Sequence, residues 1–203
     1  MEVEKSKSFF QENAISISAI VVSFCALFVS FYQTSIMREQ QYASVRPLII
    51  MGNSMGSNDE DSTGYFKLLV WNKGIGPALI KYVDIEYKGQ HYSEFDFSKI
   101  ANKMMNRPET ILISSVTSNA TASAVGAGEE ITMFEMNDKK LCFAFVDAYA
   151  KSRRQDEFTA TIYFTDVYDR FFKILMNGQQ VSPSSKQEIM AIVPEKLKSF
   201  IEF

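Results

Sequence analysis

The sequence is poor in the residues that build metal centres, disulfide scaffolds and histidine-dependent active sites. Its 203 residues include two Cys, one Trp and one His. Two Cys are too few to stabilise a small secreted fold, and one His cannot build a multi-histidine metal site. The formal net charge is −3, so no overall basic field attracts nucleic acid. We therefore predict no metal, no cofactor and no nucleic-acid partner.

Charge is also absent from one long stretch near the N-terminus. No charged residue lies between Glu12 and Arg38, and Ala14–Tyr32 within it is strongly apolar. A helix over this segment, at about 1.5 Å per residue, spans roughly 28 Å, close to the ~30 Å hydrocarbon core of a bilayer. The stretch therefore predicts a membrane-spanning helix.

This helix divides the N-terminal part of the chain into three segments. We predict an N-terminal tail over residues 1–13, a transmembrane helix over 14–33 and a helical stalk over 34–45. A cleaved signal peptide and a buried core helix are the alternatives. Phe31–Gln33 would be a poor signal-peptide cleavage site, because cleavage needs small residues. We therefore expect the helix to be retained, with the lipid bilayer as its partner.

One face of the predicted transmembrane helix carries only small side chains, at alternating steps of three and four residues. Small residues let helix backbones approach closely in lipid, and hydroxyl groups can hydrogen-bond across the contact. The pattern predicts a parallel homo-oligomer, although Ser and Ala are also tolerated in membrane helices without a partner. The predicted oligomerisation face consists of Ser16, Ala19, Ser23, Ala26 and Ser30.

The orientation of this helix in the membrane is nearly balanced. Lys5 and Lys7 precede it and Arg38 and Arg46 follow it, so the positive-inside rule gives a tie. Cys142 has no cysteine partner outside the membrane, which is more typical of a reducing compartment. We therefore favour a cytoplasmic location for the rest of the chain.

After Arg46 the chain is predicted to be mainly β, because short apolar runs alternate with turn residues. A β-sandwich over residues 46–180 fits this spacing better than a parallel α/β sheet. The expected strands are Leu48–Met51, Tyr65–Trp71, Ala78–Tyr87, His91–Tyr92, Thr110–Ser114, Glu130–Met136, Phe158–Phe164 and Phe171–Met176.

The remaining segments were assigned by composition and periodicity. Gly52–Gly64 and Ser115–Gly128 are rich in polar and small residues and are predicted loops. Phe95–Met105 fits a short helix, whereas Asp138–Lys151 fits a helix or a strand equally well. An amphipathic C-terminal segment over 181–203 is expected to contain a short helix.

The most distinctive motif joins two of the expected strands. Its sequence, V-x-N-x-G-x-G-P-A-x-I, runs from Val70 to Ile80. The glycines permit a tight turn or bulge, the proline stops strand pairing, and the asparagine can hydrogen-bond to local backbone. We interpret these residues as a structural turn rather than a ligand-binding loop; they are Asn72, Gly74, Gly76 and Pro77.

This motif resembles two groups of proteins. One is the CARDB-type, immunoglobulin-like adhesion and scaffold domains; the other is a set of small bacterial proteins with one membrane helix, an Arg-Pro pair and the same turn. The resemblance implies an immunoglobulin-like β-sandwich behind a single transmembrane helix, and it implies no activity. The matching positions are Arg46, Pro47, Asn72, Gly74, Gly76, Pro77 and Ala78, with Phe164, Asp166 and Tyr168 in a later hairpin.

Residues that could carry chemistry are few. His91 is the sole candidate general base, and no G-x-S-x-G nucleophile motif accompanies it, so we predict no catalytic residue. Lys151, Arg153 and Arg154 form the main basic stretch and are candidate anion-binding residues. Basic residues at a helix end also complement the helix dipole, which explains them without a ligand.

The sequence therefore favours a membrane-anchored, oligomerising protein that is not an enzyme and that binds or assembles partners through its sandwich. Its partner would be another protein or a small anionic ligand. The runner-up is a membrane-acting effector of a bacterial anti-phage defence system whose soluble domain senses a small signal, such as a nucleotide. A membrane-tethered hydrolase that depends on His91 is a third, weaker hypothesis.

Overall fold

A computed structural model describes residues 2–58, 63–108, 120–121, 123–137, 139–176, 181–195 and 198. The chain divides into two compact units, Met1–Ser44 and Val45–Phe203. We call the second the C-terminal unit.

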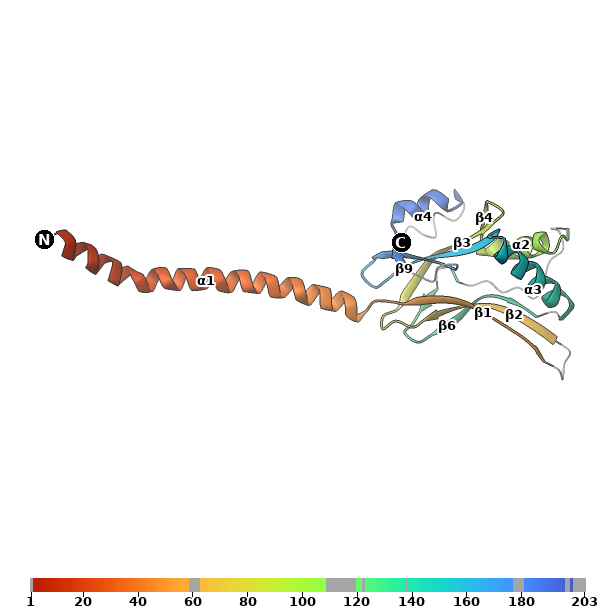
Figure 1. Ribbon diagram of the computed structural model, residues 1–203, viewed down its shortest axis with the longest axis horizontal. Coiled ribbons are helices and arrows are strands. Elements are labelled where there is room, and N and C mark those ends of the chain that lie inside the picture. The colour runs from red at the N-terminus through yellow and green to blue at the C-terminus, as the bar shows by residue number, and fades with distance from the viewer. Residues whose placement is uncertain are drawn as a thin grey trace. The chain divides into compact units, whose positions relative to one another are not determined.

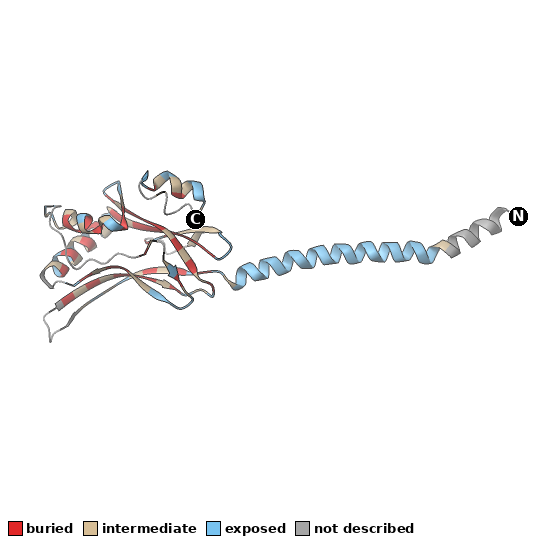
Figure 2. Ribbon diagram, turned by 180° about the vertical axis from the view of Figure 1, so that it is seen from behind, coloured by how far each residue is buried: buried red, intermediate tan, exposed pale blue. Residues whose placement is uncertain are grey.

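The first unit is a single helix, α1 (Glu2–Ser44). The helix begins at Glu2, so part of the predicted tail is helical. Asn13–Ser44 is long and apolar enough to cross a membrane, and its most apolar part is not buried within the structure (Figure 2). A signal sequence can have the same length and composition.

The C-terminal unit contains two antiparallel sheets (Figure 1). The smaller has the order β1-β2-β6, built from β1 (Ile49–Asn58), β2 (Thr63–Asn72) and β6 (Glu130–Met136). In its register Ile49 faces Asn72 and Met55 faces Phe66. The strands over Tyr65–Trp71 and Glu130–Met136 were expected from the sequence.

The predicted loop at Gly52–Gly64 is wrong over much of its length, because β1 continues to Asn58 and β2 begins at Thr63. A Cβ at Gly52 would lie 2.4 Å from the Trp71 ring, and one at Gly56 would lie 2.7 Å from the Tyr65 hydroxyl. Each aromatic side chain thus covers a glycine on the neighbouring strand. This cross-strand cover compensates for the low strand preference of glycine, which composition alone cannot reveal.

The larger sheet has the order β4-β3-β7-β8-β9, with β5 paired to β3. The register of β3 against β7 places Leu79 opposite Thr165 and Tyr87 opposite Phe158. Two short strands were missed, β5 inside a predicted loop and β9 near the C-terminus. The strands are β3 (Ala78–Tyr87), β4 (Gln90–Ser93), β5 (Ala124–Val125), β7 (Phe158–Thr165), β8 (Phe171–Leu175) and β9 (Val181–Pro183).

One hydrophobic core lies between the two sheets and is completed by helices (Figure 2). The short turn η1 (Glu94–Asp96) leads into α2 (Phe97–Met104), and α3 (Lys139–Arg154) resolves the ambiguous 138–151 segment as a helix. The buried residues of α3, Cys142, Phe145, Tyr149 and Ser152, recur at steps of three, four and three, which is a helical period. The Phe145 and Tyr149 rings lie 5.1 and 5.2 Å from Phe66.

A separate, smaller cluster lies on the other face of the larger sheet. Here α4 (Lys186–Ile192) packs Ile189 and the following Val193 against Tyr82 and Tyr163. Ser185 caps this helix by accepting a hydrogen bond from the Glu188 amide at 3.1 Å. The helix ends at Ile192 because Val193, the residue before Pro194, is extended and avoids the helical region.

The coarse prediction of an N-terminal apolar helix followed by antiparallel sheets is confirmed. More of the described residues lie in helices than in strands, so "mainly β" does not describe this structure. The long α1 and the helical structure of the 138–151 segment, which the sequence left open between helix and strand, account for this difference. The predicted strand at Thr110–Ser114 lies outside the described residues.

Candidate functional site

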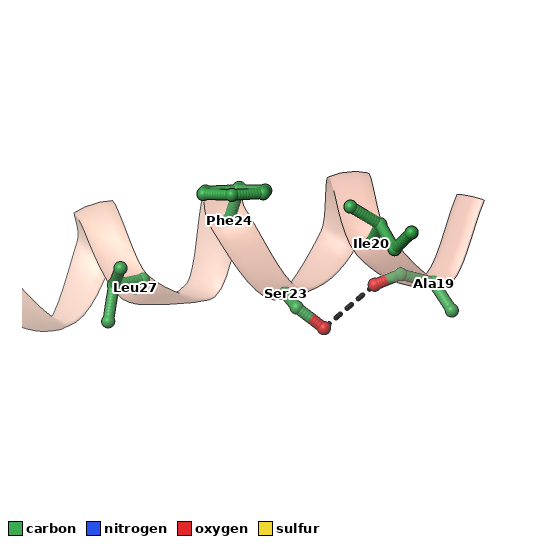
Figure 3. A pocket seen from close by; sticks show the side chains of 5 residues that line it. All are labelled: Ala19, Ile20, Ser23, Phe24 and Leu27. Atoms are coloured by element: carbon green, nitrogen blue, oxygen red, sulfur yellow. Dashed lines mark hydrogen bonds between the residues drawn. The ribbon is translucent and has the colours of Figure 1, made fainter. Parts of the chain in front are cut away.

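The predicted oligomerisation face lies on a helix whose side chains are exposed throughout this segment. A shallow groove of about 410 Å³ runs beside two of its small residues, Ala19 and Ser23, and is bordered by Ile20, Phe24 and Leu27 (Figure 3). The Ser23 hydroxyl donates to the Ala19 carbonyl at 2.7 Å. This hydroxyl is therefore satisfied within its own helix, and close packing is the main contribution the face offers a partner.

The predicted structural turn holds the first residues of the C-terminal unit. Asn72 is fully buried and uses its whole side-chain amide. Its Oδ1 accepts from the Leu48 amide at 3.2 Å and the Gly74 amide at 2.9 Å. Its Nδ2 donates to the carbonyls of Gly76 at 2.7 Å and Val125 at 2.9 Å. One side chain thus bonds to four backbone groups, which come from three segments of the chain.

The two glycines of this turn are required because backbone passes directly over them. A Cβ at Gly74 would lie 2.3 Å from the Leu48 nitrogen, and one at Gly76 would lie 1.9 Å from the Val45 oxygen. We call Val45–Leu48 the junction segment, because it follows Ser44 at the end of α1. The motif therefore packs against and hydrogen-bonds to the segment that follows the apolar helix. The sequence alone did not indicate this role.

A second turn at the same end of the larger sheet is held by Asp166. This residue is fully buried, and its Oδ1 accepts from the amides of Tyr168 at 2.9 Å and Arg170 at 3.1 Å. Its Oδ2 accepts from Arg170 Nε at 2.7 Å. Leu79 pairs with Thr165, so this turn and the Asn72 turn leave the same end of the β3–β7 pair. We call this the junction end.

The opposite end, which we call the far end, holds a polar cavity of about 580 Å³. The cavity lies between the end of β3, the C-terminal end of α2 and the outer side of α3. It contains two basic and two acidic side chains, Lys88, Lys151, Asp147 and Glu157. Lys88 lies 3.7 Å from Glu157, whereas in the described part of the chain Asp147 and Lys151 have no ion-pair partner.

The structure does not bring the three candidate anion-binding residues together. Lys151 lines the far-end cavity, but Arg153 and Arg154 do not. Arg153 is only partly exposed, and among the described residues its buried Nη1 has no hydrogen-bond partner. The nearby Tyr149 has its pKa raised to about 12, by burial above all. Lys151, Arg153 and Arg154 are close in sequence on one helix, but they do not form a common site.

His91 lies on β4 with its side chain 53% exposed, and its Nδ1 is 2.8 Å from Asp84 Oδ2. Burial raises the pKa of Asp84, and the hydrogen bond from His91 opposes this. The other oxygen, Oδ1, is buried without a partner in the described structure. Neither the groove on α1 nor the far-end cavity includes His91. Over the described residues, no three His, Cys, Asp or Glu side chains are grouped to hold a metal ion.

Comparison with known proteins gives this chain no relative: no protein-family model matches it, and neither does any curated protein.

Proposed function

We propose that this chain is a single-pass membrane protein whose C-terminal unit is an immunoglobulin-like β-sandwich, similar to CARDB-type domains. It binds or assembles partners at the membrane face and catalyses no reaction. The observation that carries the proposal is the exposed apolar helix α1, joined directly to a segment that Asn72 and two glycines hold. Such a junction suits a unit that must stay firmly attached to an anchor.

The second part of the proposal is that copies associate through the small-residue face of α1. The test replaces Ala19, Ser23 and Ala26 with Leu and measures chemical cross-linking in native membranes. Larger side chains push helix backbones apart, so the cross-linked oligomer should decrease strongly. Unchanged cross-linking would show that this face makes no contact between copies.

A matched control keeps the amount of leucine similar on the other side of the helix. Ile17, Val21 and Phe28 lie opposite the small-residue face in a helix of 3.6 residues per turn. Their replacement by Leu should leave the cross-linking yield as it is in the natural protein. An equal loss in both variants would point to a general effect on membrane insertion.

The proposed location of the C-terminal unit is cytoplasmic. Cysteines introduced at Ser184 and Met55, with Cys142 changed to Ser, can be labelled in intact cells with a membrane-impermeant thiol reagent. Protection until lysis is the expected result. Labelling of intact cells would place this unit outside the membrane.

The far-end cavity favours a second candidate function, a membrane-acting effector of an anti-phage defence system that senses a small molecule. Its volume of about 580 Å³ lies within the ~300–1,000 Å³ of ligand pockets. Lys88 and Lys151 would meet an anionic signal such as a nucleotide. Asp147 and Glu157 line the same cavity and oppose a purely anionic ligand.

Expression in bacteria during phage infection separates the two candidates. An effector should depolarise the membrane once the signal is present, and Lys151→Glu should abolish that response. A binding or assembly protein should leave the membrane potential unchanged under the same conditions.

A further inference from the structure

The junction end exposes large apolar side chains at the tips of its two turns. Ile75, between the two glycines of the Asn72 turn, is 73% exposed. Val167 and Tyr168, at the tip of the Asp166 turn, are 49% and 46% exposed. Leu48 of the junction segment is 47% exposed. Four apolar side chains therefore face outward from one end of the C-terminal unit.

These turns present their apolar tips rigidly. The Gly74 amide bonds to Asn72 Oδ1, and the Ile75 amide donates to the Arg46 carbonyl at 3.3 Å. The Tyr168 amide bonds to the buried Asp166, and the guanidinium of Arg170 lies 5.9 Å from the Tyr168 ring. Because buried polar groups define both turns, folding itself gives no reason for Ile75 or Val167 to be apolar.

The position of the junction end along the chain indicates what could cover it. Val45 is the eighth residue after Met37, the last residue of the charge-free stretch. If helical, this segment rises about 12 Å, which is only a few ångströms more than the headgroup layer of roughly 5–8 Å on each side of a bilayer. The peptide bond Ser44–Val45 therefore holds this end close to any membrane that α1 spans.

The charges at this end do not favour anionic lipid over neutral lipid. Arg46 and Lys73 are exposed there, and so are the acidic residues Glu129 and Asp169. Apolar side chains, by contrast, gain by leaving water for the boundary between headgroups and acyl chains. The apolar tips, not the net charge, thus define the chemistry of this surface.

We propose that the junction end, with Ile75, Val167, Tyr168 and Leu48 at its tips, docks on the surface of the bilayer that α1 spans. This proposal rests on the proposed membrane anchoring. The bilayer covers the exposed tips and limits how the C-terminal unit tilts above it. Because insertion is apolar, the docking does not depend on anionic lipid.

The test uses the full chain reconstituted into phosphatidylcholine vesicles, with a polarity-sensitive fluorophore on one cysteine at a time. Cys25 reports on α1, with Cys142 changed to Ala. Ile75→Cys reports on the docking surface, in a chain in which Cys25 and Cys142 are changed to Ala. Met55→Cys in that same background is the matched control, because Met55 is apolar, 59% exposed and near the opposite end of β1.

The expected result is blue-shifted emission at positions 25 and 75, quenched by lipids brominated on their acyl chains, with neither effect at position 55. If position 25 is quenched and position 75 behaves like position 55, the docking proposal is overturned and the membrane anchor stands. Without quenching at position 25, both proposals are overturned. A blue shift at position 75 that brominated lipid cannot quench would assign the surface to a protein contact and overturn lipid docking.

A second variant tests whether the two turns insert into the bilayer together, as one surface, or whether Ile75 does so alone. With the fluorophore at Val167→Cys, the change Ile75→Glu should reduce quenching by brominated lipid, because a carboxylate at the neighbouring tip resists insertion. Undiminished quenching at position 167 in this variant would overturn the shared docking surface. Including anionic lipid should leave the quenching of the natural surface unchanged.

Discussion

The two ends of the C-terminal unit differ in how far their polar side chains are buried and hydrogen-bonded. At the junction end, Asn72 and Asp166 are fully buried, and backbone groups and Arg170 occupy their polar atoms. At the far end, Asp147 and Lys151 line a cavity, and within the described structure neither has an ion-pair partner. A buried, satisfied network specifies one conformation, whereas exposed charges contribute little to stability. The junction end is thus fixed in one conformation by buried polar groups, whereas the far end keeps charged side chains in an open cavity.

The largest effect should come from Asn72→Ala. The change leaves two amides and two carbonyls without their partner, and each unsatisfied buried group costs about 1–3 kcal/mol. We expect a loss of roughly 3 kcal/mol or more in the free energy of unfolding, measured by urea titration. Asn53→Ala, on an exposed position of β1, should stay within about 0.5 kcal/mol of the natural protein. Similar losses for both would remove the special role of the junction end.

A pair of glycine substitutions compares the two ends directly. Gly76→Ala places a Cβ 1.9 Å from the Val45 oxygen, whereas Gly89, in the far-end β3–β4 turn, has φ +75° and nothing within 4 Å of its Cβ position. Overpacking of this kind costs about 1–3 kcal/mol, and the left-handed conformation costs an alanine about 1–2 kcal/mol. We expect Gly76→Ala to destabilise more, because backbone at Val45 must shift. The urea midpoints of the two variants decide the order.

Asp84, a buried carboxylate outside the junction end, should make the stability of the C-terminal unit depend on pH. Burial raises its pKa in the folded state above the ordinary value of 3.8. Between pH 3.8 and the raised pKa of folded Asp84, the folded state holds more protons than the unfolded state. The free energy of unfolding therefore falls as pH rises through that interval. The fall should be smaller in Asp84→Asn, which cannot titrate. Urea titrations over a pH series measure it.

His91 provides the control for this pH effect. Its hydrogen bond lowers the pKa of Asp84, so His91→Gln should move the fall in stability to higher pH. An identical profile in His91→Gln would show that the pair is not formed in solution.

The smallest effect should come from Lys151→Ala. Lys151 is exposed and forms no ion pair in the described structure, so the free energy of unfolding should change by less than about 0.5 kcal/mol. Thermal or urea unfolding provides the measurement. A loss comparable with that of Asn72→Ala would mean that the far end, too, is structural.

Much of the fold was predictable where local pattern and tertiary environment agree. The apolar run of α1 and the strands Ala78–Tyr87 and Glu130–Met136 are of this kind. The Gly52–Gly64 segment was not predictable, because its strand depends on Trp71 and Tyr65 from the next strand. The Asn72 motif was recognised as a turn, but its grip on Val45–Leu48 depends on contacts distant in sequence. The far-end cavity is lined by residues of β3, α2 and α3, which are distant in sequence, so no local sequence pattern predicts it.

Trp71 is the single tryptophan of the chain. Its ring lies over Gly52 of β1, and its indole Nε1 donates to Glu130 at the start of β6. All three strands of the smaller sheet therefore meet around one indole ring, and α1 contains no tryptophan. Tryptophan emission from the intact protein in a vesicle is thus a label-free reporter of the C-terminal unit alone. Each unfolding experiment above can be followed by that signal while the helix remains in lipid.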